Sequence, residues 1–127
     1  MIYGIGTDIV AVKRIEAALF KHGDRFLHRI LNEAEVAEYA NTHTPARFLA
    51  KRFAVKEAFS KAFGTGIGEA VNWHDVLVTH DAMGKPLLAV SAALQQRLDA
   101  AFINQTHVSI SDEQEHAIAF VILEKKA

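Results

Sequence analysis

The sequence contains no cysteine, two prolines, seven glycines and no long hydrophobic run. Without cysteine the chain can form neither a disulfide nor a thiolate metal site, and a cysteine nucleophile is excluded. The longest uninterrupted apolar run, Ala117–Leu123, is far shorter than the roughly 20 residues that a membrane-spanning helix requires. The first residues also lack the basic-then-apolar order of a signal peptide, so we expect a soluble, cytoplasmic protein that does not enter a membrane.

The chain also has little net charge, −1 at pH 7, but this charge is unevenly distributed. Residues 1–63 sum to +3 and residues 64–127 to −4. The basic half could face an acidic partner or phosphates, whereas the whole-chain balance gives no reason to expect nucleic-acid binding. With 127 residues, 50% of them hydrophobic, the composition excludes extended disorder and predicts a single domain over residues 1–127.

Hydrophobic periodicity and turn signals divide the chain into strands and helices. The expected helix caps are Asp24, Asn32 with Glu35 three residues later, Thr44 before a proline, and Ser91. From the N-terminus to the C-terminus, the expected elements are a strand over 2–10, helices over 12–22, 25–31, 33–39 and 45–63, strands over 73–79 and 87–90, a helix over 92–102, and strands over 106–111 and 117–123.

The later strands indicate the fold class. The turn-rich segment Asp81–Pro86 should join the strands on either side of it into a hairpin. The last strand, Ala117–Leu123, is apolar at both odd and even positions, so both of its faces should be covered, by helices or by another subunit. No internal repeat, linker or low-complexity tract interrupts these elements, and the pattern predicts one compact α+β domain.

The predicted helix over residues 45–63 carries the most informative pattern. One side of its helical wheel is apolar, and the other side combines Ala50, Ala54 and Ala58 with charged residues. We interpret the alanines as leaving the backbone of this face open to close approach by an anionic group. On the same face Glu57 and Lys61 are four residues apart and therefore adjacent, although such pairs are also common on solvent-exposed helices.

Two features of this region have alternative interpretations. Arg52 and Lys56 fall near the apolar side of the helix, and the wheel leaves open whether they reach past it or meet phosphates or a partner protein. The loop Gly64–Gly68 lacks the spacing of a dinucleotide fingerprint or a Walker loop. Its backbone N–H groups could contact a phosphate, and a simple helix stop is the alternative.

Two carboxylates from distant parts of the sequence could share a metal ion. Asp8 lies near the end of the first predicted strand and Glu57 on the long helix. Mg2+ is commonly held by one or two carboxylates, with substrate phosphates and water completing its octahedron. His107 begins a predicted strand and could point into such a site, or it could be an ordinary hydrogen-bonded histidine.

Three segments together resemble a known family, the holo-[acyl-carrier-protein] synthases, which are the short, bacterial class of 4'-phosphopantetheinyl transferases. The segments are Gly4–Val10, Arg47–Gly66 and His107–Asp112, and Gly84-Lys85-Pro86 lies between the second and the third. The Trp/Phe-Lys-Glu-x-x-x-Lys core of these transferases is present as residues 55–61, with Val55 where larger relatives often have an aromatic residue. The resemblance spans nearly the whole chain in order.

The resemblance implies a fold, a reaction and an assembly. The fold would be a single α+β domain with a largely antiparallel sheet and a long central helix. Members of the family move the phosphopantetheine arm of coenzyme A onto a serine of apo acyl carrier protein in fatty acid biosynthesis and release adenosine 3',5'-bisphosphate. Short members resemble homotrimers whose active sites lie between neighbouring subunits.

The matching positions also acquire expected roles. Asp8 and Glu57 should hold Mg2+ against the pyrophosphate of coenzyme A, and either carboxylate or a metal-held water could accept the serine proton. Lys61 should lie beside the scissile phosphate. His107 matches a family histidine near the coenzyme A site, with a binding or proton-transfer role. Expected contacts to coenzyme A come from Arg47, Lys51, Arg52, Gly64, Thr65, Gly66, Pro86 and His107.

A basic stripe on the first predicted helix is the expected docking surface for the carrier protein. Arg14 and Lys21 fall on one side of this helix, and Arg25 joins them if the turn at Gly23 allows it. The carrier proteins of this family have an acidic recognition helix, so these contacts should speed encounter and weaken with added salt.

Two other function classes account for part of the pattern. A non-catalytic module that binds an acidic helix explains the basic stripe but leaves Asp8, Glu57 and Lys61 without a joint role. A magnesium-dependent phosphodiesterase would use the two carboxylates for a different reaction. Incubation with apo carrier protein, Mg2+ and coenzyme A separates these hypotheses from the transferase.

Overall fold

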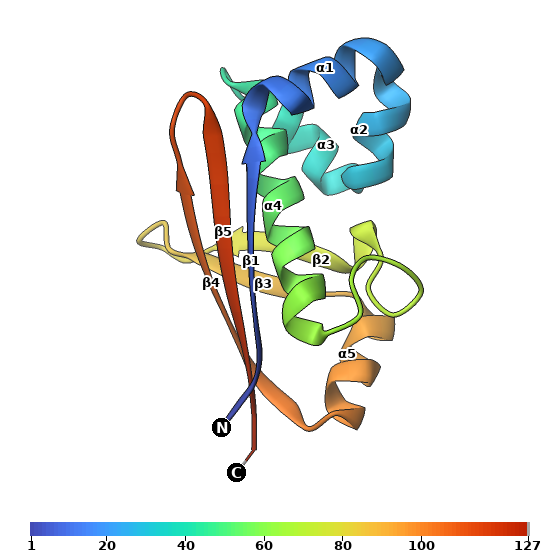
Figure 1. Cartoon of the computed structure of the whole chain (residues 1–127), viewed down its shortest axis with the longest axis vertical. Coiled ribbons are helices and arrows are strands. Elements are labelled where there is room, and N and C mark those ends of the chain that lie inside the picture. The colour runs from blue at the N-terminus through green and yellow to red at the C-terminus, as the bar shows by residue number, and fades with distance from the viewer. Residues whose placement is uncertain (127) are drawn as a thin grey trace.

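The computed structural model describes residues 1–126, and a three-stranded antiparallel sheet packed against one long helix forms its centre (Figure 1). The strand order is β1–β5–β4, and a separate antiparallel hairpin pairs β2 with β3. In chain order the elements are β1 (Ile2–Ala11), α1 (Val12–His22), α2 (Asp24–Ile30), α3 (Glu33–Ala40), α4 (Pro45–Phe63), a 3-10 turn (Trp73–Asp75), β2 (Val76–His80), β3 (Pro86–Val90), α5 (Ala92–Ala100), β4 (Ile103–Asp112) and β5 (His116–Lys125).

Helix α4 lies on the inner face of the sheet and is buried on most of its circumference. The middle strand, β5, presents alternate residues to it, and Ala117, Ala119, Val121 and Leu123 have no exposed surface. Figure 1 shows α1, α2 and α3 gathered at one end of this layer and α5 at the other, with the β2–β3 hairpin crossing between. The predicted α+β domain with a long central helix is therefore confirmed.

Strand β1 approaches α4 so closely that two of its positions accept only glycine. A Cβ atom built on Gly4 would lie 1.9 Å from the carbonyl oxygen of Ala62, and one built on Gly6 would lie 2.0 Å from that of Ala58. Ala54 and Ala58 have no exposed surface. The interpretation that the alanine face of this helix is open to an anionic group is therefore wrong, because the small residues receive a strand and not a ligand.

The outer face of the same sheet carries exposed hydrophobic side chains. Ile5 and Ile9 of β1 are 57% and 61% exposed, and Ile118 and Phe120 of β5 are each 40% exposed. The strand register places Ile9 beside Ile118 and Thr7 beside Phe120, so these side chains form one continuous patch. The expectation that both faces of β5 are covered is thus met within the chain on one face only.

Most expected elements are present, with shifts at their ends. Asn32 and Glu35 form the predicted capping box of α3, and the Ser91 hydroxyl accepts the N–H of Leu94 at the start of α5. Thr44 precedes α4 as predicted, but its side chain makes no capping hydrogen bond. The expected Asp24 cap is wrong, because Asp24 is the first residue of α2 and Gly23 stands at the cap position. The segment Trp73–Asp75, expected as strand, forms a 3-10 turn that Asn72 caps, so β2 begins at Val76.

The approach of β1 to α4 predicts that Gly6→Ala destabilises the fold. The added methyl group would overlap the backbone of α4, which can move only if the sheet moves with it. We expect the free energy of unfolding to fall by about 3 kcal/mol, measured by urea denaturation. Gly68→Ala is the matched control, because nothing lies within 4 Å of a Cβ at that position, and its change should stay within about 0.5 kcal/mol. A Gly6→Ala protein as stable as Gly68→Ala would contradict this account.

Candidate active site

Asp8 and Lys61 meet where β1 lies against α4. Alternate residues of β1 face α4. Gly4 and Gly6 lie against the helix, and Asp8 is the next residue on the same face of the strand. The Lys61 ammonium donates hydrogen bonds to Asp8 Oδ1 and to the carbonyl oxygen of Thr7, both at 3.1 Å. The side chain of Asp8 is 15% exposed and that of Lys61 is 50% exposed, so the pair opens to solvent on the lysine side.

Glu57 precedes Lys61 by one helical turn, and the charges of Asp8 and Lys61 both act on its carboxyl group. Its pKa is raised, first by partial burial and next by the negative charge of Asp8. Lys61 and Arg14 oppose this shift by favouring the ionised form. The structure thus brings together the two carboxylates and the lysine that the sequence predicted, and it adds Arg14 from α1 as a nearby cation.

The carboxylate pair has the donor chemistry that Mg2+ requires. The ionised form of Glu57, which the charge of Asp8 disfavours, would gain from a shared cation, and hard oxygen donors are the ligands that Mg2+ prefers. Within residues 1–126, no group of three or more His, Asp and Glu side chains is placed to hold a metal by itself. Asp8 and Glu57 therefore fit an ion whose remaining ligands are water and substrate phosphate.

His107 lies apart from this site within one chain. It stands on β4 opposite Ile122 of β5, and alternate residues of both strands point to the outer face of the sheet. Its Nε2 is 2.5 Å from Glu124 Oε1. Asp8 faces α4 on the inner side, so the expected meeting of His107 with Asp8 and Glu57 does not occur within a single chain.

A cleft of about 440 Å³ contains several of the predicted coenzyme A contacts. It lies between α3, α4 and the β2–β3 hairpin, and Lys51, Arg52 and Pro86 are among its lining residues. The Arg47 Nε and the Lys51 Nζ both approach the Asp112 carboxylate, at 3.8 and 3.9 Å. Sequence reasoning missed Asp112 and His80, which also line the cleft, because no spacing rule links β2 and β4 to α4. It also missed Phe48, because this residue lies on the apolar side of α4, where the helical wheel predicts core residues.

Arg52 is more deeply buried than its predicted role suggested. Its side chain is 6% exposed, and its guanidinium donates to the Glu38 carboxylate at 3.3 Å and to the Val78 carbonyl oxygen at 3.4 Å. It also stacks over the Phe48 ring at 4.6 Å. Arg52 therefore already has protein partners at the edge of the cleft, and its contact with coenzyme A stays a prediction.

The glycine loop after α4 is a helix stop in this structure. Gly64 and Gly66 adopt positive φ angles of 100° and 70°. The N–H groups of Gly64, Thr65 and Gly66 all donate to the carbonyl oxygen of Ser60. Their backbone donors therefore close the helix, as in a left-handed C-cap, and any contact of these residues with coenzyme A stays a prediction.

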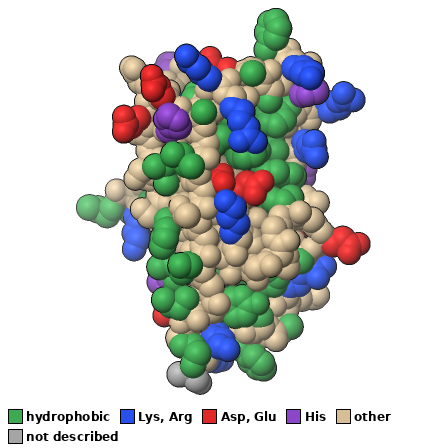
Figure 2. Space-filling view, in the orientation of Figure 1, with side chains coloured by type: hydrophobic (Ala, Val, Ile, Leu, Met, Phe, Trp, Pro, Cys, Tyr) green, Lys and Arg blue, Asp and Glu red, His purple; other side chains and the backbone are tan. Residues whose placement is uncertain are grey.

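The three predicted docking residues, Arg14, Lys21 and Arg25, are all exposed. Figure 2 shows Lys and Arg side chains gathered over the end of the molecule that α1 and α2 occupy in Figure 1. Arg25 borders a hollow of about 430 Å³ together with His22, Phe26 and Arg29. This surface is therefore basic with an apolar component, which suits an acidic, amphipathic helix.

Comparisons with known proteins agree with this arrangement. A family model described as the 4'-phosphopantetheinyl transferase superfamily matches residues 4–121. A holo-[acyl-carrier-protein] synthase of Laribacter hongkongensis is 52% identical over 124 residues, which cover 98% of this chain and 99% of that protein. The crystal structure of holo-[acyl-carrier-protein] synthase from Neisseria meningitidis has a TM-score of 0.95 at 47% identity, with 98% and 100% of the two chains covered. The synthase from Bacillus anthracis in complex with CoA (3',5'-ADP) has a TM-score of 0.82 at 41% identity, with 99% of each chain covered.

The raised pKa of Glu57 predicts that Glu57→Gln is more stable than the original chain at neutral pH. Folding favours the protonated carboxyl, so the ionised group costs stability as the pH rises from its unfolded-state pKa through its raised folded-state pKa. The difference in melting temperature between the two proteins should therefore be small in acid and grow toward neutral pH, with the variant higher. Calorimetry across pH 4 to 8 measures it.

Glu113→Gln, which removes an exposed carboxylate from the β4–β5 turn, is the control and should show no such growth. The assigned cause of the Glu57 shift is wrong if Glu57→Gln is less stable than the original chain at neutral pH.

Proposed function

The chain belongs to the 4'-phosphopantetheinyl transferase superfamily, and we propose that it is a holo-[acyl-carrier-protein] synthase. It transfers the 4'-phosphopantetheine moiety of coenzyme A to a serine of apo acyl carrier protein, giving holo acyl carrier protein and adenosine 3',5'-bisphosphate for fatty acid biosynthesis. The observation that carries this proposal is the group formed by Asp8, Glu57 and Lys61, held together in a chain that is similar over its whole length to synthases of this name. Its cytoplasmic localisation stays a prediction.

In this reaction the serine oxygen forms a bond to the phosphorus that carries the pantetheine arm, and the bond from that phosphorus to the bisphosphate breaks. The serine proton passes to a base, and negative charge develops on the leaving phosphate. Asp8 and Glu57 would hold Mg2+, which when bound neutralises charge on the pyrophosphate. The Lys61 ammonium, half exposed beside Asp8, is placed to offset or protonate the departing phosphate.

The cleft beside α4 is the proposed site for the nucleotide part of coenzyme A. Lys51 on its wall and Arg47 one turn before it supply positive charge for phosphates, and Pro86 supplies an apolar wall. The carboxylates Asp8 and Glu57 do not line this cleft within the chain. A complete site therefore needs the cleft of one subunit beside the carboxylates of another.

The cleft of one subunit would lie beside the carboxylates of another if the outer face of the sheet forms the interface between subunits. The exposed patch of Ile5, Ile9, Ile118 and Phe120 is apolar and continuous, which is typical of an interface and costly in water. His107 stands on this same face, so association would bring it toward a neighbouring subunit. We propose a homotrimer with active sites between subunits, in which His107 supports coenzyme A binding or proton transfer.

The proposed reaction predicts a covalent gain of mass on the carrier protein. Incubation of the protein with apo acyl carrier protein, coenzyme A and Mg2+ should add the phosphopantetheine moiety to the carrier, as measured by intact-protein mass spectrometry. Coenzyme A hydrolysis that needs no carrier would support the phosphodiesterase instead, and binding of the carrier without any covalent change would support the module.

Glu57→Gln should lower the turnover number of the transfer reaction on the order of a hundredfold, because it removes one of the two carboxylates that would hold Mg2+.

The proposed assembly predicts that Phe120→Lys yields a folded monomer with little activity. A lysine at the centre of the outer face must be desolvated on association, whereas in a monomer it stays hydrated. Size-exclusion chromatography with light scattering measures the mass, and circular dichroism checks the fold. Met83→Lys, at a hairpin position that is 92% exposed, is the control and should leave the assembly intact. The assembly is wrong if Phe120→Lys retains the mass of the original chain, or if the original chain is itself a monomer.

A further inference from the structure

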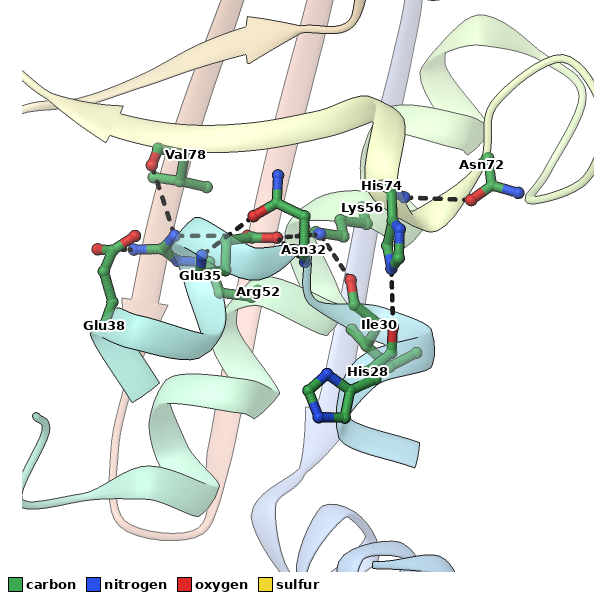
Figure 3. Close-up of polar contacts among 10 residues, drawn as sticks. All are labelled: His28, Ile30, Asn32, Glu35, Glu38, Arg52, Lys56, Asn72, His74 and Val78. Carbon is green, nitrogen blue, oxygen red and sulfur yellow. Dashed lines mark hydrogen bonds and ion pairs between the residues drawn. The ribbon is translucent and has the colours of Figure 1, made fainter. Parts of the chain in front are cut away.

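Lys56, which belongs to the transferase core pattern at residues 55–61, is buried away from the candidate active site. Lys56 immediately precedes Glu57, yet its side chain points to a different side of α4 and has 0% exposed surface. Its ammonium donates to Glu35 Oε1 and to the carbonyl oxygen of Ile30, both at 2.7 Å. Figure 3 shows these contacts at the junction where α2 ends and α3 begins. Lys56 therefore clamps two short helices to the helix that carries Glu57.

Glu35 links this clamp to two further contacts. Its Oε1 also accepts the N–H of Asn32, which closes the capping box of α3. Its Oε2 accepts no hydrogen bond and faces Arg52 Nη1 at 3.5 Å. Arg52 continues the network to Glu38 and to β2 at the edge of the cleft. One chain of buried charges thus joins the α2–α3 junction to the cleft.

Helix α2 receives a second side-chain donor at the same end. The last carbonyl groups of a helix have no partner within it, and in α2 two of them accept from outside. The Ile30 carbonyl oxygen accepts from Lys56 Nζ. The His28 carbonyl oxygen lies 2.8 Å from His74 Nε2, which must donate because a carbonyl oxygen can only accept (Figure 3). The backbone N–H of His74 in turn donates a hydrogen bond to the side-chain oxygen of Asn72. Positive charge near the C-terminus of a helix also suits its dipole.

A fold does not in general require a buried ion pair for its stability. Buried charges lose their hydration, and an apolar pair of similar volume is often as stable or more stable. What a charged pair with directional hydrogen bonds adds is a defined position for the groups that it joins. Here the joined groups are α4, next to Glu57, and α2, which carries Arg25 of the docking surface.

We propose that Lys56, Glu35 and His74 are positioning residues that hold α2 in a fixed orientation relative to α4, so that the docking surface on α1 and α2 keeps the arrangement that the carrier protein recognises. The proposal rests on the proposed function. It differs from a direct contact because Lys56 and Glu35 have almost no exposed surface and cannot touch the carrier. It therefore predicts a defect in carrier recognition without a matching defect in coenzyme A binding.

The double variant Lys56→Met/Glu35→Leu tests the proposal directly, because it removes both charges together and keeps the volume apolar and filled. We expect it to fold with a lower melting temperature, because the Asn32 N–H loses its capping-box acceptor and Arg52 keeps only Glu38 as a charged partner. Its KM for apo carrier protein should rise about fivefold to tenfold, while kcat and the KM for coenzyme A change by less than about twofold. A double variant with an unchanged KM for the carrier overturns the proposal.

His74→Ala keeps the test decisive if the double variant fails to fold. His74 is mostly exposed at the protein surface and its loss leaves the core intact, but the His28 carbonyl loses its donor. We expect the KM for the carrier to rise about threefold, with the KM for coenzyme A unchanged. An unchanged KM for the carrier in this variant contradicts the role given to His74 and, where the double variant is unfolded, the proposal as a whole.

Two comparisons separate positioning from charge and from general instability. Raising the salt concentration should weaken carrier recognition as steeply in the double variant as in the original chain, whereas Arg25→Ala should reduce that salt dependence.

Leu98→Ala, in α5 at the far end of the molecule (Figure 1), destabilises the core and should leave the KM for the carrier unchanged. A raised KM for the carrier in Leu98→Ala would show that the KM follows stability alone. Failure of the proposed function differs from all of these outcomes, because the original chain would then transfer nothing.

Discussion

The close approach of β1 to α4 is the constraint on which the rest of the structure depends. Gly4 lies against the carbonyl oxygen of Ala62, and Gly6 lies against that of Ala58. Two residues of a strand span about 6.6 Å and four residues of a helix about 6 Å, so the two backbones run in opposite directions and stay in step. Asp8 is the next residue on this face of the strand, and the long Lys61 side chain reaches its carboxylate. No larger residue at the glycine positions allows this approach.

Helix α4 uses its different sides for separate tasks, and this explains its unusual mixture of residues. One side packs on the sheet, a second carries Glu57 and Lys61, and a third buries Lys56 and Arg52 against α3 and the hairpin. Because one element carries these groups, a shift of α4 would move the Glu57–Lys61 site and the cleft wall together. Catalysis of phosphoryl transfer depends mainly on positioning and charge neutralisation, and the proposed reaction would use Glu57 and Lys61 from this one helix.

The sequence predicted the parts of the molecule that depend on local signals. The capping box of α3, the Ser91 cap and the Ala117–Leu123 strand follow from neighbouring residues, and each is present. The sequence did not predict what covers the alanine face of α4, because that contact comes from a strand about fifty residues away. A helical wheel likewise could not predict that Lys56 is buried. A lysine beside an apolar arc turns inward where it meets a buried carboxylate, here Glu35 from another helix, which the wheel does not include.

The shared metal site of Asp8 and Glu57 is the central claim, and the coupling between Mg2+ and coenzyme A binding tests it most directly. Titration calorimetry of the protein with coenzyme A, with and without Mg2+, measures how strongly the ion favours the ligand. If both carboxylates hold the ion against the pyrophosphate, Mg2+ should strengthen binding by about tenfold or more, and the double variant Asp8→Asn/Glu57→Gln should lose this gain. An equal gain in the double variant would place the ion elsewhere and contradict the account.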